Sequence, residues 1–177
     1  MFEAAFAIAL MLTTTSRSLD GTLVRIDNGN PSQIVIQAEG QFQTFALTKR
    51  VVVDRESTFA NAAATTVRIK LADLTPGEYV RLQIDAQGHV TKARAVANVE
   101  RARVRSANDS IVVLEDGTTL TIGSVLRFVN EKGKPSPTAT LRSGETVLLF
   151  RHPQTRNIYR FSAEPRITRL RKRTDAS

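Results

Sequence analysis

Arginine is the commonest of the charged side chains that could do chemistry in this chain of 177 residues. Three of the arginines, Arg101, Arg103 and Arg105, alternate with apolar residues. On a β-strand, residues two apart lie on the same face, about 6.6 Å from one another. A guanidinium group binds phosphate through two hydrogen bonds, and phosphates along a nucleic-acid strand repeat at a comparable spacing. The pattern therefore predicts a face that binds polyanions.

A second basic cluster lies at the C-terminal end of the chain. It completes the predicted polyanion-binding residues, which are Arg101, Arg103, Arg105, Arg166, Arg169, Arg171, Lys172 and Arg173. Residues 1–97 hold 10 Lys and Arg against 9 Asp and Glu, whereas residues 98–177 hold 15 against 8. Nearly all of the formal net charge of +8 therefore belongs to the second half. Such a charge attracts polyanions, acidic lipid or an acidic partner.

The remaining titratable residues do not form the pattern of an active site. Asp54 and Glu56 would lie about 7 Å apart on one strand face, a separation found between catalytic carboxylates. Their neighbours, however, are typical of a solvated strand end. His89 and His152 are expected to be exposed in turns, without an acid or second histidine at metal-ligand spacing. The chain has no cysteine. We therefore expect no catalytic residues, metal or cofactor, and predict that the protein is not an enzyme.

The elements that must position these residues are β-strands, and their signals occur twice in the same order. Residues 21–96 and 99–163 each contain alternating apolar residues, glycine turns and a Leu-x-x-Gly-Glu-x-Val segment, at 74–80 and 141–147. Period-two alternation is typical of strands, and many short strands favour a sandwich or small barrel. Only residues 59–64 break the pattern, as a short helical turn or an open loop. The predicted fold is all-β: two tandem small antiparallel β-barrels (OB/SH3-like), with a short apolar N-terminal segment and a basic C-terminal tail.

The repeated Leu-x-x-Gly-Glu-x-Val segment has a direct structural interpretation. Its leucine would close one end of a barrel, its glycine would form a tight turn, and its valine would begin the next inward-facing strand. With the closing Ala-Arg-Ala-Val at 93–96, the segment resembles a family of bacterial extracytoplasmic small β-barrel domains of unknown function, over residues 19–97. The resemblance implies an exported binding or assembly module without an active site, and it supplies no functional residues.

The first residues indicate where the protein acts. Residues 4–12 form an apolar run that is shorter than the roughly 20 residues of a membrane-spanning helix but matches the core of a secretory signal. The residues before it include an acid and no Lys or Arg, which a misassigned start codon would explain. Docking of this run on the β units is the alternative. We therefore divide the chain into a signal-like or docking segment (1–18), a first repeat (19–97), a second repeat (98–164) and a basic tail (165–177).

These observations favour a non-enzymatic binding or structural module of the bacterial cell envelope or surface, located outside the cytoplasm. Its expected partners are an envelope or surface component, further copies of itself joined through strand edges, or a polyanion; a stable membrane span is not expected. The alternative is a protein that binds nucleic acid or another polyanion with its basic second half. Single-strand binders add exposed aromatic rings, whereas the aromatic candidates here fall mostly at inward-facing positions: Phe42, Phe45, Tyr79, Phe128, Phe150, Tyr159 and Phe161.

Overall fold

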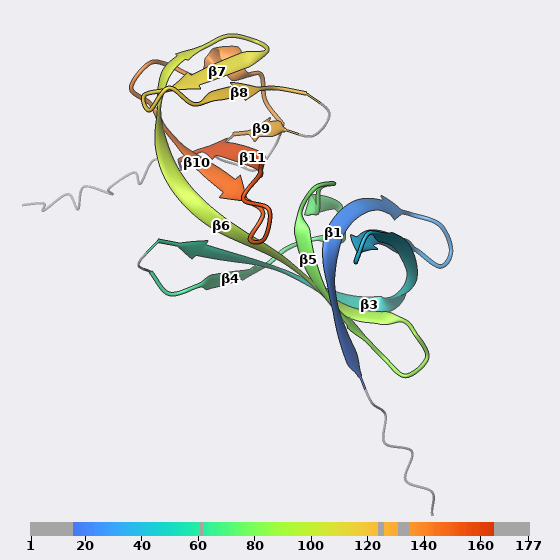
Figure 1. Ribbon diagram of the computed structural model, residues 1–177. Coiled ribbons are helices and arrows are strands. Elements are labelled where there is room, and N and C mark those ends of the chain that lie inside the picture. Colours follow the sequence, from blue (N-terminus) through green and yellow to red (C-terminus); the bar gives the residue numbers. More distant parts are fainter. Residues whose placement is uncertain (1–15, 61, 124–125, 131–134, 165–177) are drawn as a thin grey trace, which may run out of the picture.

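A computed structural model describes residues 16–60, 62–123, 126–130 and 135–164, and shows an all-β protein (Figure 1). Eleven strands form one mixed sheet. Among the described residues, the helical elements are two single 3-10 turns, η1 (Leu71–Asp73) and η2 (Thr138–Thr140). The strands are β1 (Arg17–Asp27), β2 (Gln33–Ala38), β3 (Gln41–Phe59), β4 (Thr65–Arg68), β5 (Tyr79–Ile84), β6 (Val90–Ala107), β7 (Ile111–Leu114), β8 (Thr119–Thr121), β9 (Arg127–Val129), β10 (Thr146–Arg151) and β11 (Ile158–Ala163). The predicted all-β class is confirmed.

In the first half of the chain, the strand pairings return to the strand where they begin. β1 pairs with β2 and β5, β2 also pairs with β3, and β5 also pairs with β6, all antiparallel. The end of β3 then runs parallel to β6, with residues 52–59 beside residues 92–99. The expectation of a purely antiparallel arrangement is wrong for this pair, because the chain passes through β4, η1 and β5 before β6 enters beside β3.

The second half follows the same order of pairings, with its third strand interrupted. The far end of β6 pairs with β7 and β10, β7 also pairs with β8, and β10 also pairs with β11, all antiparallel. β9 lies parallel to β11. This pair corresponds to the parallel pair of the first half, which the end of β3 forms with β6. Figure 1 shows the two halves at opposite ends of β6. The closure of each half into a barrel stays a prediction.

A single strand, β6, serves both halves, and the predicted boundary between residues 97 and 98 lies inside it. Its first part pairs with β5, and its last part pairs with β10 and β7. Buried hydrophobic residues form one cluster in each half. A third cluster takes residues from both: Ala97, Val99, Phe150 and Tyr159, with Phe59 and Leu148 packed against them. Continuous backbone and packed side chains therefore join the halves.

The two Leu-x-x-Gly-Glu-x-Val segments have the structure that their sequence predicts. Leu74 and Leu141 are buried, and the glycines that follow have φ of +90° and +80°, a backbone region that side chains with a Cβ rarely adopt. In the first turn the glycine N–H donates to the Leu23 carbonyl of β1 at 2.8 Å, and in the second it donates to the Val104 carbonyl of β6 at 2.7 Å. The same hydrogen bond, from the glycine turn to a strand far back in the chain, thus forms once in each half.

The aromatic residues mostly lie in the core, as their inward-facing positions predict. Phe128 and Phe161 are 4% and 0% exposed, and their ring centroids lie 5.1 Å apart. Phe45, Tyr79, Phe150 and Tyr159 are buried as well. Phe42 is the exception: it is 69% exposed on the outer face of the β2–β3 hairpin.

Candidate functional site at the junction of the two halves

The three predicted arginines of β6 share its exposed face. Arg101, Arg103 and Arg105 are all exposed, and Arg105 lies at an irregularity in the pairing of β6 with β7. Arg101 forms an ion pair with Glu164 at 2.7 Å. Within the part of the chain that the structure describes, Arg103 and Arg105 have no acidic partner. The other five predicted basic residues lie outside the described residues: Arg166, Arg169, Arg171, Lys172 and Arg173.

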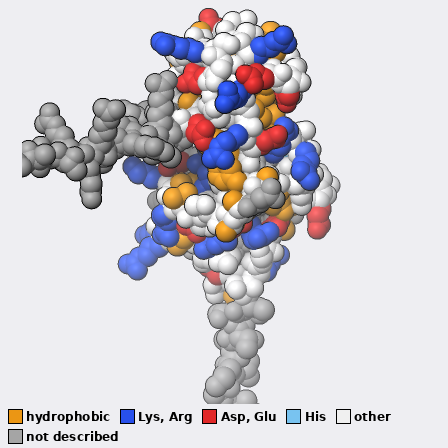
Figure 2. Space-filling model, turned by 90° about the vertical axis from the view of Figure 1, so that its left-hand side faces the viewer, with side chains coloured by type: hydrophobic (Ala, Val, Ile, Leu, Met, Phe, Trp, Pro, Cys, Tyr) orange, Lys and Arg blue, Asp and Glu red, His pale blue; other side chains and the backbone are white. Residues whose placement is uncertain are grey.

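Acidic residues border the same arginines. The groove beside Arg101 and Arg103 is also lined by four acids: Glu100, Glu115, Asp116 and Glu164. The positive potential of the β6 face is therefore partly neutralised by fixed charges. Figure 2 shows this mixture of basic and acidic groups on one face of the molecule, with hydrophobic atoms at the surface between the upper and lower parts.

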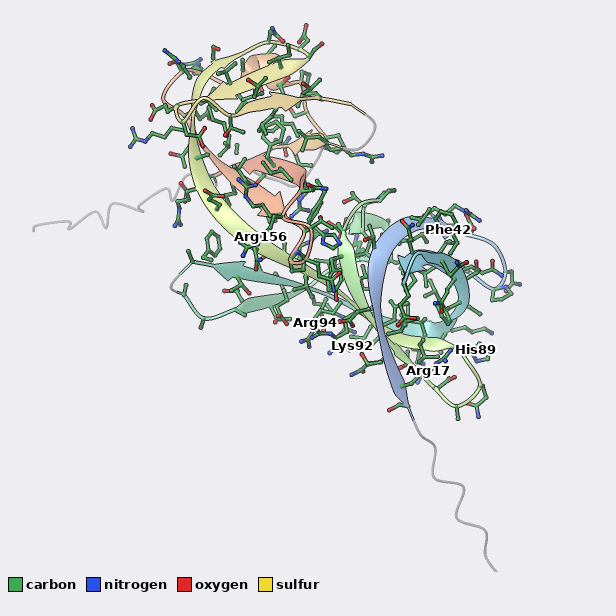
Figure 3. The ribbon with its side chains drawn as sticks, viewed as in Figure 1. Arg17, Phe42, His89, Lys92, Arg94 and Arg156 are labelled. Atoms are coloured by element: carbon green, nitrogen blue, oxygen red, sulfur yellow. The ribbon has the colours of Figure 1, made fainter. Side chains whose placement is uncertain are left out.

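The sequence predicts that the carboxylates of Asp54 and Glu56 are solvated. This prediction is wrong, because both carboxylates are paired with cations of β6. Lys92 Nζ lies 3.0 Å from Asp54, and Arg94 donates to Glu56 at 2.8 Å. The parallel pairing of β3 with β6 places these side chains side by side, and Figure 3 shows Lys92 and Arg94 near the crossing of the long strands. Arg68 lies 3.9 Å from Asp54 as well, so three cations compensate the two carboxylates.

A buried ionic cluster centres on Glu78, the glutamate of the first Leu-x-x-Gly-Glu segment. Glu78 is 0% exposed, and its carboxylate accepts hydrogen bonds from the Arg55 guanidinium at 2.7 Å and from the Thr75 backbone N–H at 3.2 Å. Arg160 of β11 lies 3.7 Å from Oε1 of Glu78, the oxygen that Arg55 contacts. The Arg160 guanidinium also lies 3.9 Å from the centroid of the Phe150 ring. Burial, and then the neighbouring Arg55, lower the pKa of Arg160. One carboxylate thus links two guanidinium groups from different halves.

The turn after β10 is held by His152, which is only 4% exposed. Its Nδ1 accepts hydrogen bonds from the backbone N–H groups of Gln154 and Thr155, at 3.3 and 3.2 Å. The proton therefore belongs on Nε2, which donates to the Thr22 hydroxyl of β1 at 3.0 Å. Burial lowers the pKa of His152, which favours this neutral form. The expectation of a histidine exposed in a turn is wrong here, because the turn folds back onto the first half.

A pocket of about 420 Å3 opens beside this junction. Its walls come from three segments: the end of β3, the middle of β6, and β10 with the turn that follows it. The lining residues are Thr58, Phe59, Ala60, Asn98, Val99, Glu100, Arg151 and Arg156. The sequence had not singled out Phe59, because it lies where the alternation breaks, yet β3 continues as a strand to this residue. A cation–π contact with Arg101, at 5.1 Å from its ring centroid, adds a further guanidinium beside the pocket.

Other kinds of site receive no support from the described residues. They contain no group of three or more His, Asp or Glu side chains that could hold a metal ion. None of their helices is long and apolar enough to cross a membrane. For the ionic cluster around Glu78, the sequence offers one signal that could have found it: the glutamate recurs directly after the turn glycine in both Leu-x-x-Gly-Glu segments.

A scan against protein-family models found no matching family, and a search of curated protein sequences found no significant match. The resemblance to bacterial extracytoplasmic domains therefore stays a prediction.

Proposed function

We propose that this protein is a non-enzymatic binding or structural module of the cell envelope, built as a tandem repeat of two small OB-like β units. Two observations support the proposal: the order of pairings common to both halves, and the buried cluster around Glu78 that fixes one half against the other. Export is supported by the signal-like run at residues 4–12. In a bacterial host, mass spectrometry of secreted protein should find a chain that begins near Ser18 or Leu19; an uncleaved chain confined to the cytoplasm would contradict export.

The observation that carries a role in assembly is the free edge of β4. Among the described residues β4 pairs only with β3, and all four residues of β4 are exposed, with Val67 55% exposed. The Ile69 N–H donates to the Val53 carbonyl at 3.0 Å, so residues of the same parity direct their N–H and C=O groups towards β3. Thr66 and Arg68 therefore direct theirs outward. An exposed edge of this kind takes up a further strand from a partner or from another copy.

The test blocks this edge without disturbing the β3–β4 pair. Proline at position 66 removes an outward N–H and is tolerated on an edge strand, so Thr66→Pro should abolish association, whereas the control Thr66→Val should retain it. We would measure mass by light scattering over a range of concentrations, for the full chain and for residues 16–177. Association that persists in Thr66→Pro would contradict the β4 interface. A monomer in every case would reject assembly and leave a monomeric binding module.

A second candidate function, polyanion binding, is favoured by the common exposed face of Arg101, Arg103 and Arg105. Binding of heparin or a single-stranded oligonucleotide should weaken steeply as salt rises. A triple Ala variant at these positions should bind at least tenfold more weakly. The control replaces three other exposed arginines, at positions 50, 127 and 142, which removes the same net charge. Equal losses in both triple variants would show that net charge alone drives binding, and would reject a site on β6.

A further inference from the structure

The pocket beside Phe59 has the size and the mixture of surfaces of a small-molecule site. Its volume of about 420 Å3 falls in the usual range of such sites, roughly 300–1,000 Å3. It forms where the β3–β4 hairpin meets the second half, on the side of the junction where Figure 3 shows Arg156. Neither half lines the pocket alone.

One side of the pocket is apolar. Phe59 is partly buried against the cluster between the halves, and Val99, its partner on the neighbouring strand β6, is 4% exposed. The Phe59 ring already lies against one planar cation, the Arg101 guanidinium, at 5.1 Å. A face of this ring that borders the pocket offers stacking to a planar group of a ligand.

The other side holds two arginines and one acid, Glu100. Arg151 donates to Glu100 at 2.8 Å and to the backbone carbonyl of Arg156 at 3.2 Å, so Arg151 is held in place by protein groups. The Arg156 side chain is exposed and has no acidic partner within the described residues. Arg156 is therefore the cation of this pocket that remains available to an anion.

Arg156 is held in a conformation that arginine rarely adopts. Its φ is +64°, a region that costs a residue with a Cβ about 1 kcal/mol or more. The turn that imposes it is closed by the Arg156 N–H, which donates to the His152 carbonyl at 2.9 Å, and the His152 ring is anchored to the first half through Thr22. Glycine would fit this position without strain. Backbone strain of this kind concentrates at functional sites.

We propose that this pocket binds a small ligand made of a planar ring that carries one anionic group, a phosphate or a carboxylate. The ring stacks on Phe59, and the anion pairs with the Arg156 guanidinium, which holds either group through two hydrogen bonds. The site is independent of the free edge of β4, because binding of such a ligand requires no association between copies.

The experiment is titration calorimetry on the full chain with four probes. Adenosine 5′-monophosphate carries a ring with a phosphate, and 2-naphthoate carries a ring with a carboxylate. Adenosine supplies the ring alone, and inorganic phosphate supplies the anion alone. We expect at least one of the first two to bind tenfold or more tightly than both single-feature probes, and its identity names the anion that the site takes. No binding of either combined probe at millimolar concentration would overturn the proposal, as would phosphate binding as tightly as the nucleotide.

Two variants separate recognition from folding. Arg156→Gly removes the guanidinium and relieves the positive φ, so we expect tenfold weaker binding in a protein at least as stable as the original. Phe59→Leu keeps an apolar side chain in the third cluster and should also weaken binding tenfold, by loss of stacking. The control, Arg50→Gly, removes an exposed arginine elsewhere and should bind normally. Binding that is unchanged in Arg156→Gly, or equally reduced in Arg50→Gly, would refute the site.

Discussion

Replacing Glu78 with glutamine tests whether the buried ionic cluster holds the two halves together. The substitution keeps the shape of the side chain but removes the charge that Arg55 contacts at 2.7 Å and Arg160 approaches at 3.7 Å. Both guanidinium groups are then left largely buried without a counter-charge, because their side chains are only 13% and 9% exposed. Removing one member of a buried ion pair costs about 3–5 kcal/mol. This is a large share of the roughly 5–15 kcal/mol by which a domain is stable.

The matched variant is Arg160→Met, which removes the second cation and leaves the Arg55–Glu78 pair intact. Burial disfavours the charge of Arg160 and lowers its pKa, so an apolar replacement should change the free energy of unfolding by only about 1 kcal/mol. Urea unfolding followed by far-ultraviolet circular dichroism would measure both variants. If Glu78→Gln costs under 1 kcal/mol, or if Arg160→Met costs as much as Glu78→Gln, the argument that Glu78 compensates two buried cations is wrong.

Three further predictions concern other positions. The folded-state pKa of His152 is lowered, so the unfolded chain binds the proton first as the pH falls. The contribution of His152 to stability is therefore fully present above about pH 6.5 and is lost as the pH drops below it. The difference between the free energies of unfolding at pH 7.5 and pH 5.5 should be smaller in His152→Ala. A Cβ on Gly21 would meet a backbone oxygen at 2.7 Å, so Gly21→Ala should cost about 1–3 kcal/mol in urea unfolding, whereas Gly29→Ala, whose nearest contact is 3.5 Å, should cost little. Phe161 is 0% exposed, so Phe161→Ala should lower the free energy of unfolding by about 3–5 kcal/mol. Phe42 is 69% exposed, so Phe42→Ala should lower it by less than about 0.5 kcal/mol. Comparable losses in the two variants would contradict these burial assignments.

What could be predicted from the sequence depended on local signals. The period-two pattern identified the strands, and the positive φ of Gly77 and Gly144 followed from a turn that only glycine fits easily. The parallel pairing of β3 with β6 is a contact between residues about 40 positions apart, and no local pattern encodes it. That pairing places Lys92 beside Asp54, which from sequence alone had the appearance of a solvated acid.

The candidate site was harder to predict, for the same reason. Arg101 and its neighbours on β6 could be placed on one face from their spacing, and the structure agrees. The junction residues could not be found in this way, because Glu78 and Arg160 meet only when the two halves are docked. His152 was misplaced because a turn is usually solvated, whereas this one is covered by β1.

The continuous strand β6 has a mechanical consequence. With 18 residues and a rise of about 3.3 Å per residue, its backbone is nearly 60 Å long when measured along the curved strand, and it runs without interruption from one core to the other (Figure 1). Tension or torque applied to one half is therefore transmitted to the other directly, through covalent bonds and the ladders on either side. The strand also fixes which side chains face each core, because a single residue inserted at the junction would turn every later side chain of the strand to the opposite face.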